Sequence, residues 1–143
     1  MGSRSAVALL QLPVRLHGIR LGQPTDLLLD DPAQRALGFV VLCGDDAQRF
    51  LPYAAAEAHA DEIVVGSALV LLDDVAFYRA RAHSLRALLG GEVTTGDHGE
   101  GPLRDLVVRA DGVVEHLVVG VDGRARRVAA PGARVTPQHA SAA

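Results

Sequence analysis

The side chains with the most chemical potential lie in a glycine-rich stretch, residues 94–101, and on the segment that follows it. Asp97, His98 and Glu100 supply two carboxylates and an imidazole, the groups that bind divalent metal ions, and His116 is a candidate fourth ligand. A flexible glycine-rich loop does not hold such ligands in one geometry. We therefore interpret the stretch as a solvated turn and expect neither a metal nor another cofactor.

Signatures of covalent and phosphate chemistry are missing from the sequence. A single cysteine, Cys43, excludes an intrachain disulfide and the zinc sites built from several cysteines. It ends an apolar stretch, which favours a buried structural thiol over a nucleophile. The sequence has no Gly-x-Ser-x-Gly and no His-Glu-x-x-His, and because it has no lysine it has no Gly-Lys-Ser/Thr phosphate loop. We therefore expect a protein that is not an enzyme.

Arginines are the second group of candidate functional residues. All 14 basic residues are arginines. Four of them gather near the C-terminus, at Arg124, Arg126, Arg127 and Arg134. They indicate either a docking patch for an acidic partner or an anionic lipid, or a solvated strand edge whose charges discourage aggregation.

The aromatic residues, three Phe and two Tyr, all lie between positions 39 and 78. We expect Phe39, Phe50 and Phe77 to form a core between the two halves of the chain. Tyr53 and Tyr78 are either part of that core or exposed anchors for a partner.

Charge and hydropathy restrict the class of protein. The 143 residues are 49% hydrophobic and carry a formal net charge of −3, whereas nucleic-acid binding usually requires a basic surplus. The apolar residues near the N-terminus are interrupted by Gln11 and Pro13 and are too few for a membrane span. We therefore expect a cytoplasmic protein without a transmembrane segment.

The second half of the chain reads as a three-stranded antiparallel meander. Alternating apolar residues predict strands at 103–109, 113–121 and 124–129. Asp111-Gly112 and Asp122-Gly123 separate them as type I′ turns. Ala133–Val135 is a candidate last strand, and residues 136–143 are expected to fray.

The first half shows a noisier version of this pattern. Extended segments are expected at 14–20, 25–29, 37–43, 48–52 and 63–65, and one or two helical turns at 53–59. Ser67 is a candidate cap for a short helical turn. Asp73 or Asp74 is expected to cap a helix that runs to about Ala82.

The two halves align as an internal repeat. The alignment matches Leu21-Gly22 to Leu89-Gly90, residues 37–43 to 103–109 and residues 48–51 to 114–117. It predicts an N-terminal segment (1–13), a first copy (14–72), a helical connector (73–84), a second copy (85–135) and a disordered tail (136–143). Copies this small are expected to share one core.

Residues 88–93 and 102–119 resemble the PRC-barrel family. The resemblance lies in Leu-Leu-Gly-Gly-Glu-Val, a glycine-rich loop, and an apolar strand that contains Asp105 and leads into a hairpin. In the first half Val40 stands at the aspartate position. The resemblance implies a mainly β protein, with tandem small barrels and short helical connectors packed as one body. We expect a mainly structural role for Asp105, since a buried carboxylate needs partners.

The family resemblance implies an adaptor or assembly role rather than a reaction. We therefore expect a non-catalytic module that binds a protein partner, with a second copy of this chain as one candidate. Two alternatives stay open: a sensing domain that binds a small ligand or metal near Asp97, His98 and His116, and a ribosome- or RNA-associated factor.

Overall fold

The computed structural model describes residues 2–30 and 33–137, so most of the predicted tail lies outside the described residues. The chain forms mainly strands: β1 (Arg4–Ser5), β2 (Val14–Leu16), β3 (Ile19–Asp30), β4 (Arg35–Cys43), β5 (Gln48–Pro52), β6 (Glu57–Ala58), β7 (Ile63–Val64), β8 (His83–Ser84), β9 (Glu92–Thr95), β10 (His98–Val108), β11 (Val114–Val121), β12 (Arg124–Ala129) and β13 (Ala133–Thr136). The helices are short: α1 (Ala6–Leu9), η1 (Tyr53–Ala55), η2 (Ala68–Val70), α2 (Val75–Arg79) and α3 (Leu85–Leu88).

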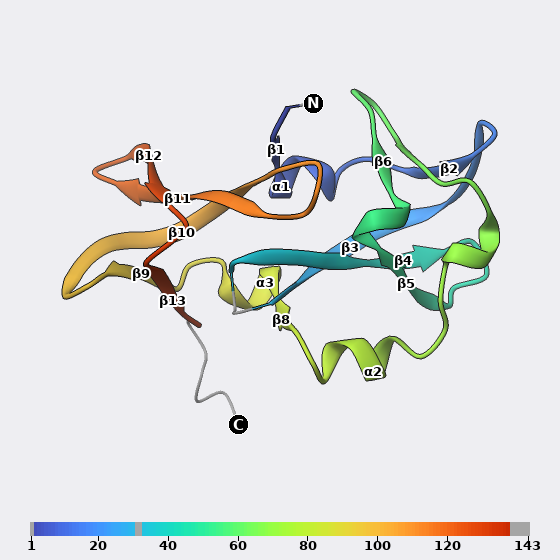
Figure 1. The fold of residues 1–143 in the computed structure, drawn as a ribbon. Coiled ribbons are helices and arrows are strands. Elements are labelled where there is room, and N and C mark those ends of the chain that lie inside the picture. The colour runs from blue at the N-terminus through green and yellow to red at the C-terminus, as the bar shows by residue number, and fades with distance from the viewer. Residues whose placement is uncertain (1, 31–32, 138–143) are drawn as a thin grey trace.

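The strands form two sheets, one at each end of an elongated body (Figure 1). The first sheet has the order β5-β4-β3-β2-β7-β6, with β8 added to β3. The second has the order β12-β11-β10-β9-β13, with β1 added to β10. The predicted class, mainly β with short helical connectors, is therefore confirmed. Across the described residues, no helix is long and apolar enough to cross a membrane.

The predicted meander is confirmed as β10, β11 and β12, and the predicted last strand as β13. Asp122 and Gly123 both have positive φ, at 51° and 78°, as a type I′ turn requires. The turn at Asp111-Gly112 differs from the prediction, because of these two residues only Gly112 has positive φ. The loop of this hairpin is one residue longer than a two-residue type I′ loop. The Arg109 amide donates to the Val113 carbonyl, and the Gly112 amide donates to the Arg109 carbonyl.

The first half departs from prediction at two places. The predicted strand at 14–20 is a hairpin that turns at His17-Gly18, where φ is 50° and 80°. The predicted helical turns at 53–59 are reduced to η1, because Glu57 and Ala58 pair with β7 instead. Alanine has the highest helix propensity of any residue, but intrinsic propensity is small beside a tertiary contact such as the pairing of β6 with β7.

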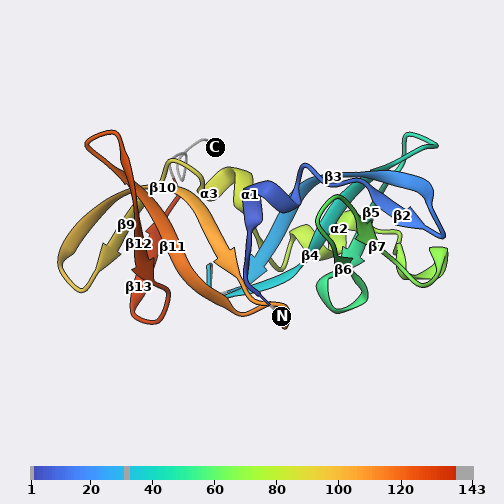
Figure 2. The ribbon, with the colours of Figure 1, turned by 90° about the horizontal axis from the view of Figure 1, so that it is seen from above.

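The N-terminal segment and the connector each join the sheet of the other half. β1 pairs with β10 of the second sheet, and β8 pairs with β3 of the first. Each of these strands leads into a short helix, α1 or α3, that packs on the same strand. Figure 2 shows both helices near the middle of the molecule, between the two sheets.

The β3–β4 and β10–β11 hairpins meet through a reciprocal pair of hydrogen bonds. The Ala36 amide donates to the Gly112 carbonyl at 2.7 Å, and the Val114 amide donates to the Gln34 carbonyl at 3.0 Å. Ala36 and Val114 occupy equivalent places at the starts of β4 and β11, as do Gln34 and Gly112 just before them. The two halves are therefore related by an approximate two-fold axis through this contact.

This symmetry shows that the predicted alignment of the halves is in the wrong register. Strand β4 corresponds to β11, not to the stretch 103–109, and β3 corresponds to β10. Asp26, which faces Val40, is therefore the counterpart of Asp105, which faces Val118. Two apolar strands look alike in sequence, and alternation alone does not say which place in a sheet each one takes.

One hydrophobic core runs through both halves and includes Leu9, Phe39, Leu88 and Leu117, each 1% exposed or less. A smaller cluster forms where α2 covers the outer face of the first sheet, around Val40 and Phe50. Phe77 was expected in the core but is 45% exposed, because it lies on the outer side of α2 under the Arg81 guanidinium.

Candidate functional site

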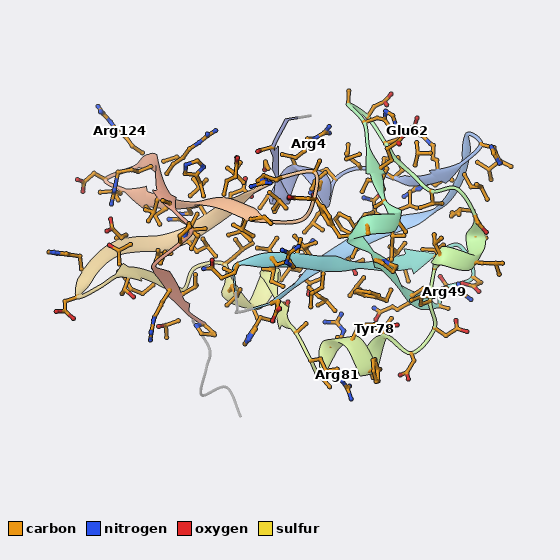
Figure 3. All side chains as sticks on the ribbon, in the orientation of Figure 1. Arg4, Arg49, Glu62, Tyr78, Arg81 and Arg124 are labelled. Atoms are coloured by element: carbon orange, nitrogen blue, oxygen red, sulfur yellow. The ribbon has the colours of Figure 1, made fainter. Side chains whose placement is uncertain are left out.

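Strand β12 carries three of the four clustered arginines on an open sheet edge. Among the described residues it pairs with β11 alone, so its other side presents backbone groups without a strand partner. Of its six residues only Val128 is buried. Figure 3 shows Arg124 at the far end of the molecule from Arg49 and Tyr78. The edge is therefore accessible and strongly basic.

Arg126 is held by the protein itself. It lies opposite Val119, whose side chain points to the core, and its guanidinium reaches the Glu100 carboxylate. The Thr95 hydroxyl and then Arg126 lower the pKa of Glu100 by hydrogen bonding. Glu100 is therefore an ion-pair partner of the arginine strand, and its carboxylate is engaged rather than free for a metal.

The remaining guanidinium groups of this edge have no carboxylate partner among the described residues. Arg127 lies opposite Val118, on the face away from Arg126. Arg104 on β10 lies beside Gly120, where a Cβ would come 2.7 Å from its Nε. Together with Arg124 and Asp122, Arg104 lines a hollow of about 420 Å³. The same hollow is lined by the small residues Gly120, Gly123 and Ala125, which let a partner approach closely. Arg127 lies outside this hollow, on the other face of β12 from Arg124.

The equivalent edge of the first sheet is closed by the chain itself. Phe50 on β5 holds the place that Arg127 holds on β12, since they face Val40 and Val118. The Phe50 amide donates to the Leu72 carbonyl and the Leu72 amide donates to the Phe50 carbonyl, both at 2.8 Å. This contact shows that the edge geometry accepts an added backbone segment, and no described residue fills the same place at Arg127.

The other interaction candidates lie elsewhere. Arg134 is exposed on β13, at the opposite end of the sheet order from β12. Tyr53 is only 9% exposed, stacks on Phe39 with centroids 5.7 Å apart, and donates its hydroxyl to the Arg109 carbonyl. Tyr78 stacks on Phe50 at 4.0 Å. Both tyrosines therefore pack within the protein rather than standing free as anchors.

The structure does not gather the candidate metal ligands. Asp97 and His98 are exposed at the β9–β10 turn, and Glu100 is bound to Thr95 and Arg126. His116 lies on β11 between Val107 and Ala129, and its Nδ1 is buried without a hydrogen-bond partner. Across residues 2–30 and 33–137, no group of three or more His, Cys, Asp or Glu could hold a metal ion.

Two carboxylates join the halves, the half-buried Asp105 and the buried Asp26, and only the first was expected from the sequence. Asp105 accepts the Ser5 hydroxyl and the Val7 and Leu106 amides, at 2.9 and 2.7 Å for the amides. This confirms its structural role.

Asp26 repeats the arrangement with the Ser84 hydroxyl and the Arg86 and Leu27 amides, and is 4% exposed. Sequence reasoning missed Asp26. The signal lay in the similar stretches Ser-Ala-Val-Ala-Leu-Leu and Ser-Leu-Arg-Ala-Leu-Leu, which begin at Ser5 and Ser84.

Comparison with known proteins adds no relative. No protein-family model matches the chain, and no curated protein matches it.

Proposed function

We propose that this protein is a non-catalytic interaction module that binds an extended acidic segment of a partner protein along β12. The observation that carries the proposal is the open backbone edge at Arg127 in the second sheet. The equivalent edge of the first sheet, at Phe50, is occupied by Leu72. An extended peptide gains affinity from main-chain hydrogen bonds when it adds to such an edge.

The charge of this surface supports an acidic partner. Arg124 and Arg127 lie on the open-edge strand itself, and Arg104 lies on β10 beside Gly120. None of the three has a carboxylate partner among the described residues, while the whole chain has a net charge of −3. A local basic surface on an acidic protein favours a specific orientation of approach and raises the association rate. Arginine also binds carboxylates through two parallel hydrogen bonds, which adds geometric selectivity.

We propose further that the chain is a tandem PRC-barrel-like protein of the cytoplasm. Support comes from the resemblance of residues 88–93 and 102–119, from the two mainly β halves, and from the single buried thiol, Cys43. Proteins of that family act mostly as adaptors, and a protein that binds its partner along the open edge of β12 would act in the same way.

The decisive experiment separates strand addition from charge. Arg127→Pro removes the guanidinium together with one backbone donor on the outer side of β12, without breaking the ladder to β11, because proline is tolerated on edge strands. Arg127→Gln is captured beside it as the matched control, because it removes the guanidinium and keeps the backbone donor, so the difference between the two variants measures strand addition. The double variant Arg124→Glu, Arg127→Glu reverses the charge and keeps the backbone donors. Tagged wild type and all three variants are used to capture proteins from a native lysate, followed by quantitative mass spectrometry.

We expect one set of proteins to be retained by the wild type and lost with Arg127→Pro and with the double variant, and Arg127→Gln should retain more of this set than Arg127→Pro. Arg20→Glu, an exposed change on the first sheet, serves as the matched control and should retain that set. Retention unchanged in both Arg127→Pro and the double variant would overturn the proposal. Capture of ribosomes that depends on salt but not on Arg127→Pro would instead favour the ribosome-associated alternative.

A further inference from the structure

A second surface, remote from β12, is a pocket of about 680 Å³ at the junction of the two halves. Its lining comes from β1, the segment between η1 and β7, and the β10–β11 loop. A volume of this size is typical of sites for small organic molecules.

Most of the pocket wall is apolar. Leu9, Phe39 and Ile63 are at most 1% exposed and form its deepest lining, and Tyr53 stacks against Phe39. Ala56 and Ala58 add small side chains that leave the volume open. Such a wall binds the hydrocarbon or aromatic body of a ligand by removing its apolar surface from water.

One guanidinium adds a positive charge to this wall. The Arg4 Nη2 donates to the His59 carbonyl at 2.5 Å, which fixes the side chain against the segment that forms the pocket. Figure 3 shows Arg4 pointing from β1 toward β6. Arg4 has no carboxylate partner among the described residues, and a guanidinium has five donors, so most of them are free for a ligand.

Among the described lining residues one carboxylate, that of Glu57, is present, and it contacts a different group. Glu57 Oε1 lies 2.7 Å from the His59 Nε2, and the Glu57 side chain is 74% exposed. Its charge is therefore largely solvated, whereas the Arg4 guanidinium lies against the apolar wall. The pocket consequently favours one negative charge near Arg4 and disfavours a positive one.

Among the described residues, the second half lacks two parts of this pocket's wall. By strand register, the counterpart of Tyr53 in the second half is Ala130, which is fully buried. The segment at 53–63 also has no counterpart there, because a tight turn leads from Ala130 directly into β13. The pocket is thus an addition to the repeated framework rather than a consequence of it.

We propose that this pocket binds a small monocarboxylate with an apolar or aromatic body, whose carboxylate pairs with Arg4 and whose body packs against Tyr53 and Phe39. A monocarboxylate fits because the site offers one guanidinium, which matches the two oxygens of a carboxylate in a parallel pair of hydrogen bonds. The surrounding wall offers mainly apolar contacts for the rest of the molecule.

The test uses three probes of the same shape: 4-phenylbutyrate, 4-phenylbutan-1-ol and 4-phenylbutylamine. Backbone amide spectra recorded by nuclear magnetic resonance are followed during titration of the full chain. We expect the acid to bind at least about tenfold more tightly than the alcohol, because a charge-assisted hydrogen bond is lost in the alcohol. The amine should bind most weakly, and the shifted amides should centre on Arg4, Tyr53 and Ala58.

Three variants complete the test. Arg4→Gln should abolish the preference for the acid while the alcohol still binds, which also shows that the pocket is intact. Glu57→Gln should leave the preference for the acid in place or strengthen it. Ala58→Leu should fill the pocket and weaken acid and alcohol alike.

The proposal is overturned if no probe shifts these amides at millimolar concentration. It is equally overturned if acid and alcohol bind alike to the wild type, or if the preference for the acid survives Arg4→Gln.

Discussion

At the scale of single residues, Asp45 shows how one side chain closes a turn. Its carboxylate accepts the Ala47 amide at 3.1 Å and both Nη atoms of Arg49, at 3.0 and 2.9 Å. The Arg49 hydrogen bonds, and then the Ala47 amide, lower the pKa of Asp45 to about 2. The β4–β5 turn is thus tied to the strand that follows it.

Asp45→Asn should therefore change the pH dependence of stability. The folded-state pKa lies below the ordinary value of 3.8, so the charged group stabilises the fold above that value and the contribution is lost as pH falls toward 2. Urea unfolding of wild type and variant between pH 2 and 6 should give a difference in midpoint at pH 6 that closes at the acid end. A difference that is equally large at pH 2 would show that the charge of Asp45 is not the cause.

Sequence reasoning reached some of these residues and not others. Asp105 was predictable because a carboxylate within an apolar strand must find partners. Asp26 follows the same rule, but it stands beside Thr25 and Pro24, where polar residues and a turn also fit. Its partner, Ser84, is 58 residues away, and no local pattern links the two.

At the scale of elements, the close packing of β4 against β5 requires glycine at position 38. A Cβ on Gly38 would lie 2.5 Å from the Phe50 Cζ and closer still to the Leu51 carbonyl oxygen. Strand β4 passes beneath the Phe50 ring at this point, which brings the smaller core under α2 close to the sheet. Only glycine leaves room for that approach.

Gly38→Ala should destabilise the protein by about 2–3 kcal/mol, since neither the ring nor the backbone oxygen has space to withdraw. Gly44→Ala is the matched control, because a Cβ there meets no atom within 4 Å, and its effect should stay within about 0.5 kcal/mol. Urea unfolding measures both changes. Equal stability of the two variants would contradict the packing argument.

Elements were predictable where side-chain alternation and turn residues coincide. Strands β10, β11 and β12 have both, and the cap at Asp74 has a local signature confirmed by its bond to the Phe77 amide at 3.3 Å. The segment 53–59 was mispredicted because alanine-rich composition says little about a strand as short as β6. Its conformation depends on pairing with β7, which is a tertiary contact.

At the scale of the whole molecule, the exchange of β1 and β8 makes each half depend on the other. A backbone amide of α1 donates to Asp105 in the second sheet, and a backbone amide of α3 donates to Asp26 in the first sheet. One core extends through both halves. The two halves should therefore unfold in a single transition.

The distribution of tyrosines makes this testable. Both tyrosines pack on the first sheet, Tyr53 against Phe39 and Tyr78 against Phe50, so their fluorescence reports that sheet, whereas far-ultraviolet circular dichroism reports both sheets. Asp105→Ala, in the half without tyrosines, removes the acceptor of the Ser5 hydroxyl and two amides and should cost about 2–3 kcal/mol. We expect the fluorescence and dichroism midpoints to fall together. A shift seen by dichroism alone would show that the halves unfold independently.

The sequence by itself determined the strand-rich class, the meander, several turns and the position of the arginines, because these depend on neighbours along the chain. Tertiary structure alone decided that β1 and β8 exchange partners, that Asp26 matches Asp105, and that β12 keeps an open edge where β5 is closed by Leu72. It also decided the pocket beside Arg4. Each of these features joins residues far apart in the chain, and alternation of side chains records which face is buried but not what covers it.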